Sequence, residues 1–135
     1  VEGHTNWLEN VVNTGKAAQF VIYEKDSDFP VGSVFLRDID YQNRKAEYGI
    51  FIGEDSARGK GIGTEAAKSI VQYGFSELKL HKIFLRVLAD NKGAIKSYEN
   101  AGFVQEAYLK DEVFLNGEYR DIVLMALINP ERSAE

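Results

Sequence analysis

Three glycines within five residues interrupt the chain at 59–63, between an apolar strand-like run and a long helical pattern. In the segment Arg58-Gly59-Lys60-Gly61-Ile62-Gly63, the three glycines have no side chain that would keep a ligand away from the backbone. Successive backbone N–H groups in such a loop can turn toward one ligand, and the start of the following helix adds partial positive charge. With the cations of Arg58 and Lys60, the segment predicts a cradle for a phosphate or pyrophosphate.

Two familiar phosphate-binding loops can be compared with this segment. Residues 61–66 fit the pattern G-x-G-x-x-A of dinucleotide-binding proteins. In that fingerprint the strand runs straight into the first glycine, whereas eight residues separate Ile52 from Gly61. The acidic residue expected about 20 positions on is also misplaced, because Asp90 lies 27 residues beyond Gly63. A nicotinamide-dependent oxidoreductase is therefore a weaker interpretation, and a Walker A loop is excluded because no Gly-Lys-Ser/Thr follows.

The rest of the chain alternates between strand and helix patterns. Residues 6–12 predict an amphipathic helix capped by Asn6. Asn116-Gly117 predicts a tight hairpin between two long strands. The other expected elements are strands at 19–23, 31–39, 46–52, 83–88, 104–115 and 118–128, a helix at 62–78, and a helix at 91–101 that is capped by Asp90 or Asn91. Strands come first and α/β units follow, which predicts an α+β domain with a mixed sheet and a frayed tail at 129–135.

Composition limits the class of protein. A chain of 135 residues with 44% apolar residues fits one globular domain, spanning 1–135. The absence of cysteine excludes disulfides and thiolate chemistry by the chain itself and makes a cytoplasmic setting our expectation. The net charge of −5 argues against a nucleic-acid partner, and no apolar run is long enough to span a membrane. No His, Asp and Glu cluster has metal-ligand spacing, so we expect no metal.

A second motif follows 28 residues after Gly63: Asn91-Lys-Gly-Ala-Ile-Lys-Ser-Tyr98-Glu-Asn-Ala-Gly102-Phe103. It resembles the signature N-x-x-A-i-x-x-Y-x-x-x-G-F of the GNAT superfamily of N-acetyltransferases. The upstream Arg-x-x-Gly-x-Gly resembles the coenzyme A loop of the same superfamily. Runs at 44–52, 73–82 and 114–121 look most like the branch that acetylates ribosomal-protein N-termini, spermidine and amino sugars.

The resemblance implies a fold and a reaction. The fold would be a three-layer α+β domain, with a mixed, mostly antiparallel twisted sheet and flanking helices. The first strand and helix of the family lack a counterpart here, and the chain opens at Val1, so we expect an N-terminally incomplete domain. The reaction would be direct acetyl transfer from acetyl-coenzyme A to a primary amine of a polyamine, an amino sugar or a protein N-terminus. A non-catalytic acyl-coenzyme A-binding or regulatory module is the alternative.

By the same resemblance, Tyr98 is the expected general acid. A phenol with a pKa near 10 is protonated at neutral pH and can donate to a departing thiolate. The strand at 48–52 would offer backbone groups to the pantetheine arm and an amide to the thioester oxygen, with Gly49 as a close-approach position. The expected cofactor-binding residues are Ile50, Phe51, Ile52, Arg58, Gly59, Lys60, Gly61, Ile62, Gly63, Thr64, Asn91, Ala94, Ser97 and Tyr98.

One departure from the family concerns the general base. Some relatives carry a glutamate on the strand five residues before the motif asparagine, where this chain has Arg86. A guanidinium cannot act as a base at neutral pH. Glu47 is our first candidate for that role, with Asp38, Asp40 and Glu112 as weaker ones that could also bind a cationic amine. We also expect that the hairpin at 114–119 could join two copies in a homodimer.

Overall fold

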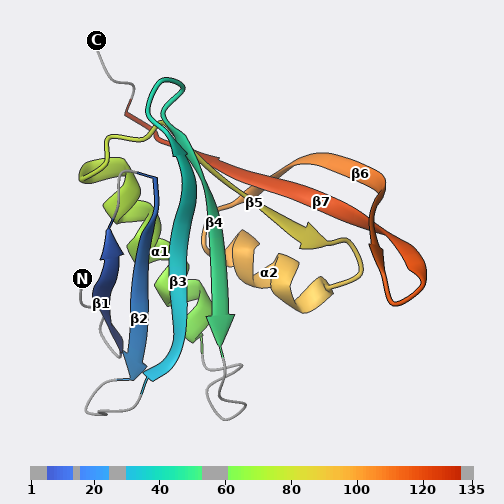
Figure 1. Cartoon of the computed structure of the whole chain (residues 1–135), viewed down its shortest axis with the longest axis horizontal. Coiled ribbons are helices and arrows are strands. Elements are labelled where there is room, and N and C mark those ends of the chain that lie inside the picture. Colours follow the sequence, from blue (N-terminus) through green and yellow to red (C-terminus); the bar gives the residue numbers. More distant parts are fainter. Residues whose placement is uncertain (1–5, 14–15, 25–29, 53–60, 132–135) are drawn as a thin grey trace.

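The computed structural model describes residues 6–13, 16–24, 30–52 and 61–131. In chain order the elements are β1 (Asn6–Asn13), β2 (Ala18–Glu24), β3 (Pro30–Asp40), β4 (Lys45–Ile52), α1 (Ile62–Ser76), β5 (Lys82–Leu88), α2 (Lys92–Asn100), β6 (Val104–Leu115) and β7 (Glu118–Ile128). The seven strands of this described part form one sheet in the order β1-β2-β3-β4-β5-β7-β6. Every neighbouring pair is antiparallel except β4 and β5, which are parallel, so the expected mixed, mostly antiparallel α+β fold is confirmed (Figure 1).

The helix predicted at residues 6–12 is wrong, because this segment is strand β1. It pairs antiparallel with β2 from Asn6↔Glu24 to Asn13↔Ala18, with a register shift between Asn10 and Val12. A helix this short has little stability of its own. The neighbouring valines also favour a strand, so pairing with β2 outweighs the weak amphipathic pattern.

Both helices cover the same face of the sheet. Leu36 of β3 and Tyr48 of β4 are cross-strand partners and point to one face. A methyl group added to Gly74 of α1 would lie 3.1 Å from Leu36 Cδ1, and the Tyr48 ring contacts Tyr98 of α2 at 6.0 Å between centroids. The apolar side chains on this face form one buried core with the inner side of α1. The buried residues of α1 are Ile62, Ala66, Ala67, Ile70, Val71 and Gly74.

Strands β4 and β5 separate soon after they meet. Their paired residues run only from Lys45↔Lys82 to Glu47↔Phe84. Beyond Glu47, β4 has no described strand on that side, while β5 stays paired with β7 along its whole length. Figure 1 shows the two strands diverging, with α2 beside the opening. We call this opening the β4–β5 wedge; it leaves backbone hydrogen-bonding groups of β4 without a partner strand.

The hairpin expected around Asn116-Gly117 is confirmed. Strands β6 and β7 pair up to Leu115↔Glu118, so only two residues form the turn. Asn116 has φ 51° and Gly117 has φ 81°, the left-handed conformations that a type I′ turn requires. The hairpin extends away from the body of the sheet in Figure 1.

Candidate active site

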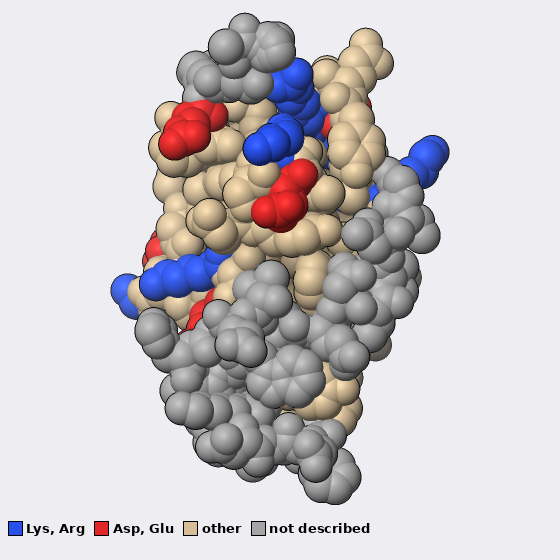
Figure 2. Space-filling model, turned by 90° about the vertical axis from the view of Figure 1, so that its left-hand side faces the viewer, with Lys and Arg blue, Asp and Glu red and all other residues tan. Residues whose placement is uncertain are grey.

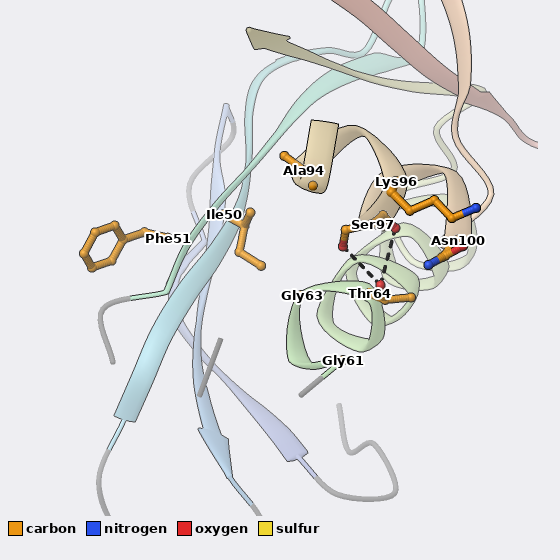
Figure 3. Close-up of a pocket in the computed structure, with 10 residues that line it drawn as sticks. Ile50, Phe51, Gly61, Gly63, Thr64, Ala94, Lys96, Ser97 and Asn100 are labelled. Atoms are coloured by element: carbon orange, nitrogen blue, oxygen red, sulfur yellow. Dashed lines mark hydrogen bonds between the residues drawn. The ribbon is translucent and has the colours of Figure 1, made fainter. Parts of the chain in front are cut away.

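A cavity of about 800 Å³ lies where the end of β4, the start of α1 and the exposed side of α2 meet (Figure 3). Most of its described lining comes from the two motifs that the sequence singles out. The lining residues are Ile50, Phe51, Gly61, Gly63, Thr64, Gly93, Ala94, Lys96, Ser97 and Asn100. A volume of this size matches the clefts that hold extended small-molecule ligands.

The start of α1 is shaped to approach an anion. Gly61 is the N-cap residue, with φ 79° and ψ 5°, and no side chain of the described residues caps the first turn. A side chain at Gly61 would meet none of the described residues within 4 Å, so the left-handed backbone, rather than lack of space, accounts for the glycine. In the described part of the chain, no side chain therefore occupies the backbone N–H groups of the first turn. This is the arrangement that binds phosphate groups at helix N-termini.

Helix α2 is capped by its own sequence. Asn91 Oδ1 accepts a hydrogen bond of 3.1 Å from the backbone N–H of Ala94, which confirms the expected cap. Asn91 itself is exposed and does not line the cavity. Its contribution is to fix the first turn of α2, which presents Gly93 and Ala94 to the cavity.

A hydrogen bond between the two helices holds the cavity walls together. Thr64 Oγ1, in the first turn of α1, donates to the backbone oxygen of Ser97 at 3.3 Å and lies 3.1 Å from Ser97 Oγ (Figure 3). Both residues also line the cavity. Because the contact joins the walls directly, the distance between α1 and α2 depends on it.

Tyr98 does not line the cavity in the described structure, although it lies on the same helix as residues that do. Its ring packs edge-on against Tyr48 and against Phe103, at 6.0 and 6.1 Å between centroids. Burial raises the pKa of Tyr98, and burial together with the nearby Tyr98 raises the pKa of Tyr48 well above 10.0. Both phenols therefore keep their protons at neutral pH.

Glu47 lies where β4 and β5 part, on the face opposite the helices. Its side chain is only 8% exposed and its Oε2 accepts a hydrogen bond of 3.1 Å from Arg86 Nε. Arg37 Nη2 lies 3.4 Å from the same oxygen. The carboxylate is therefore held between two guanidinium groups from the neighbouring strands β3 and β5.

The structure brings together half of the cofactor-binding residues expected from the sequence. Those that line the cavity are Ile50, Phe51, Gly61, Gly63, Thr64, Ala94 and Ser97. The side chain of Ile62 is instead buried in the core, because it begins the inner face of α1. Arg58, Gly59 and Lys60 lie outside the described residues, as does the side chain of Ile52.

The sequence interpretation missed three lining residues, Gly93, Lys96 and Asn100. Together with Ser97 they recur at intervals of three or four, which places them on one side of α2. That periodicity was the signal available in the sequence. The close approach expected at Gly49 exists, but the neighbour is the ring of Phe35, whose Cζ lies 2.1 Å from where a Cβ would be.

The face at the left of Figure 1 carries charges of both signs. Basic and acidic side chains are interspersed over its described part in Figure 2, so no extended field of one sign covers this face. The described residues contain no group of three or more His, Asp or Glu that could hold a metal ion. Neither of the two described helices is long and apolar enough to cross a membrane.

The family model of the acetyltransferase (GNAT) domain matches residues 1–104. This chain belongs to the GNAT acetyltransferase family. The resemblance of the two motifs is thereby confirmed, and the cavity between β4, α1 and α2 is formed by those same motifs.

Curated relatives place the chain near enzymes of amine acetylation. It is 36% identical to the spermidine N(1)-acetyltransferase of Vibrio cholerae over 110 residues, covering 82% of this chain and 62% of the relative. It is 39% identical to the spermidine N(1)-acetyltransferase of Escherichia coli K12 over 104 residues, covering 77% of this chain and 55% of the relative. The chain thus spans less than two thirds of the length of these relatives.

Solved structures agree with the fold. The spermidine N-acetyltransferase of Vibrio cholerae in complex with CoA and spermine superimposes with a TM-score of 0.79 at 35% identity, covering 84% of this chain and 66% of that one. The dodecameric structure of the same enzyme in an intermediate state gives a TM-score of 0.78 at 35% identity, with the same coverage. The mixed sheet with its β4–β5 wedge is therefore the GNAT fold.

Proposed function

We propose that this chain carries the coenzyme-binding and catalytic part of an acetyl-coenzyme A-dependent N-acetyltransferase that acts on a primary amine. The observation that carries the proposal is the cavity between the unpaired edge of β4 and the α1 N-terminus, which no described side chain caps. The relatives at 36% and 39% identity are spermidine N(1)-acetyltransferases, and a relative at 29% identity is a ribosomal-protein-serine acetyltransferase. Polyamines, amino sugars and protein N-termini are the acceptor classes we propose.

The residues present fit coenzyme A. The first-turn N–H groups of α1 would hold its pyrophosphate, with Arg58 and Lys60 as proposed additional cations. The free edge of β4 at Ile50 and Phe51 would pair with the amide groups of the pantetheine arm as another strand would. When bound, acetyl-coenzyme A supplies the acetyl thioester that the amine attacks. Ala94 and Ser97 of α2 would close the other side of the arm.

In this proposal Tyr98 is the general acid that donates its proton to the leaving thiolate. Burial keeps Tyr98 protonated at neutral pH, which a proton donor requires. Replacing Tyr98 by Phe should lower kcat by roughly 10²–10⁴-fold, the usual contribution of a general acid, and leave the Kd for coenzyme A near that of the wild type. Coenzyme A release is measured with a thiol reagent over a panel of amines. A Tyr98→Phe variant as active as the wild type would contradict the role.

Glu47 is the proposed general base, because it is a buried carboxylate at the start of the wedge. Its two arginine contacts also suit a purely structural anchor, and one variant separates the two roles. Glu47→Gln keeps the shape and one acceptor oxygen but cannot take a proton. If Glu47 is the base, kcat falls and the acidic limb of the kcat–pH profile disappears; if it is an anchor, that limb stays.

The rival function, a non-catalytic acyl-coenzyme A-binding module, has one observation in its favour. Arg86 stands where some relatives carry a catalytic glutamate, and its Nε donates a hydrogen bond to one carboxylate oxygen of Glu47. Calorimetry with coenzyme A alone tests this rival. Tight binding without coenzyme A release from acetyl-coenzyme A and any amine of the panel would establish it in place of catalysis.

The β6–β7 hairpin is our proposed contact between two copies of the chain. Phe114 and Tyr119 flank its turn, both exposed, with ring centroids 5.0 Å apart. Exposed aromatic pairs of this kind are typical of protein–protein contacts. A Phe114→Asp variant should be smaller than the wild type by sedimentation. Equal sedimentation of the two proteins would exclude the hairpin from the contact.

A further inference from the structure

The hydroxyl of Tyr48 is the buried polar atom that the fold leaves unexplained. Tyr48 is 3% exposed, and its Oη is the only buried side-chain nitrogen or oxygen of the described residues that lacks a hydrogen-bond partner. Native proteins satisfy nearly all such groups, so each exception calls for an explanation. Phenylalanine would fill the same space without leaving a polar atom unsatisfied. The hydroxyl therefore needs an explanation other than packing.

Tyr48 stands at the start of the wedge. It follows Glu47, the last residue of β4 that pairs with β5, and it points to the face covered by the helices. Ile50, two residues further along the same face, lines the cavity. Tyr48 thus lies between the closed end of the sheet and the cavity proposed to hold coenzyme A.

The nearest polar side chain of the aromatic cluster around Tyr48 is Tyr98. The Tyr48 ring contacts the Tyr98 ring edge-on at 6.0 Å and the Phe103 ring at 5.8 Å between centroids. Phe103 offers no hydrogen-bonding group to its neighbours through its side chain. The two hydroxyls share no direct hydrogen bond, so a link between them needs a bridging water molecule.

We propose that Tyr48 is a positioning residue for Tyr98, whose hydroxyl it holds through one bridging water molecule, to which Tyr48 donates a hydrogen bond. The inference rests on the proposed role of Tyr98 as general acid. As the amine nitrogen bonds to the acetyl carbon and the carbon–sulfur bond breaks, the Tyr98 proton passes to the sulfur. The tyrosinate left on Tyr98 accepts the hydrogen bond of this water, and a proton lost by the new amide nitrogen restores the phenol.

The burial of the two residues fits this direction of donation. Tyr48 is 3% exposed, whereas Tyr98 is only partly buried, and burial raises the pKa of both phenols. The more deeply buried hydroxyl loses more solvation on ionising, so Tyr48 remains the donor when Tyr98 loses its proton. A donor aimed at a developing negative charge stabilises it most in a site from which water is excluded.

The test compares Tyr48→Phe with the wild type and with Tyr41→Phe, which removes a hydroxyl from an exposed position in the turn after β3. The titration of Tyr98 is followed by NMR of tyrosine labelled with ¹³C at Cζ, with its signal assigned from Tyr98→Phe. We expect Tyr98 to titrate at higher pH in Tyr48→Phe, because its tyrosinate loses a donor. We also expect kcat to fall roughly tenfold or more, with an unchanged KM for acetyl-coenzyme A. The control should match the wild type in both measurements.

Each result decides the question. An unchanged Tyr98 titration in Tyr48→Phe overturns the proposal, whatever the activity. A raised KM with unchanged kcat overturns it too, because the hydroxyl would then contact the cofactor instead of Tyr98. If the wild type acetylates no amine, the proposed function fails while the titration still decides the Tyr48–Tyr98 pairing. A melting temperature of Tyr48→Phe at or above that of the wild type at neutral pH shows that the variant folds.

Discussion

Arg86 on β5 donates a hydrogen bond of 3.1 Å from its Nε to Oε2 of Glu47 on β4, at the point where the two strands begin to diverge. Arg37 on β3 approaches the same oxygen to 3.4 Å. Glu47 is 8% exposed, whereas the side chains of Arg86 and Arg37 are 46% and 49% exposed. One buried carboxylate thus ties three adjacent strands together at the closed end of the wedge.

This asymmetry of burial predicts an asymmetry of stability. Arg86→Met leaves the buried Glu47 carboxylate with only the longer contact to Arg37, whereas Glu47→Gln leaves two arginines that can reach water. We expect Arg86→Met to lower the free energy of unfolding by about 1–3 kcal/mol, because an unpaired buried charge is costly and the exposure of the arginines moderates the loss. Glu47→Gln should cost less. Urea denaturation measures both, with Arg86→Lys as the variant that keeps a charge. A larger loss in Glu47→Gln would reverse the interpretation.

The Thr64–Ser97 contact predicts coupling between the two helices. Thr64→Val keeps the side-chain shape but removes the hydroxyl that bonds Ser97 across the cavity. We expect coenzyme A to bind several-fold more weakly, since the walls of its proposed site lose their direct link; one neutral hydrogen bond contributes about 1 kcal/mol. Calorimetry on Thr64→Val, Ser97→Ala and the double variant forms a mutant cycle. Additive losses would show that the two hydroxyls act independently.

Two helical glycines form a matched pair for a packing prediction. A Cβ on Gly74 would lie 2.8 Å from Ile83 Cδ1 and 3.1 Å from Leu36 Cδ1, whereas a Cβ on Gly93 meets nothing within 4 Å. We expect Gly74→Ala to lower the melting temperature, because overpacking costs about 1–3 kcal/mol and exceeds the gain in helix propensity. Gly93→Ala should raise it slightly. Equal shifts in the two variants would show that β5 moves aside at little cost.

The sequence predicts most of this fold because its local signals agree with the tertiary structure. The Asn116-Gly117 turn, the Asn91 cap and the apolar spacing of α1 each have a local cause, and each is confirmed. The prediction for the segment at 6–12 is wrong because it relied on a cap at Asn6 and a weak amphipathic pattern. Its strand conformation comes from hydrogen bonds to β2, which local periodicity does not reveal.

The candidate site was predictable in its motifs but not in its contacts. The glycine spacing at 59–63 and the motif from Asn91 to Phe103 identified the elements that line the cavity. The ion pairs of Glu47 with Arg37 and Arg86, and the packing of Tyr48 on Tyr98, join residues far apart in the chain. They depend on strand register and on where β4 leaves β5, neither of which leaves a trace in a single sequence.

The buried tyrosines predict a loss of stability at alkaline pH. Burial raises the pKa of Tyr48 and of Tyr98 above the 10.0 of an unperturbed phenol, so above that pH the unfolded chain releases protons that the folded chain still holds. The stability that these groups contribute is complete below pH 10 and declines as the pH rises toward the folded pKa, by up to about 1.4 kcal/mol per pH unit for each group.

Urea denaturation at a series of pH values from 9 to 11 should show a shallower decline for Tyr48→Phe than for the wild type. Tyr108, whose pKa is raised by its hydrogen bond to Asp121, is present in every variant and cancels in the comparison. Tyr41→Phe should follow the wild-type curve, and a Tyr48→Phe curve parallel to it would show that Tyr48 ionises alike in the folded and unfolded chain.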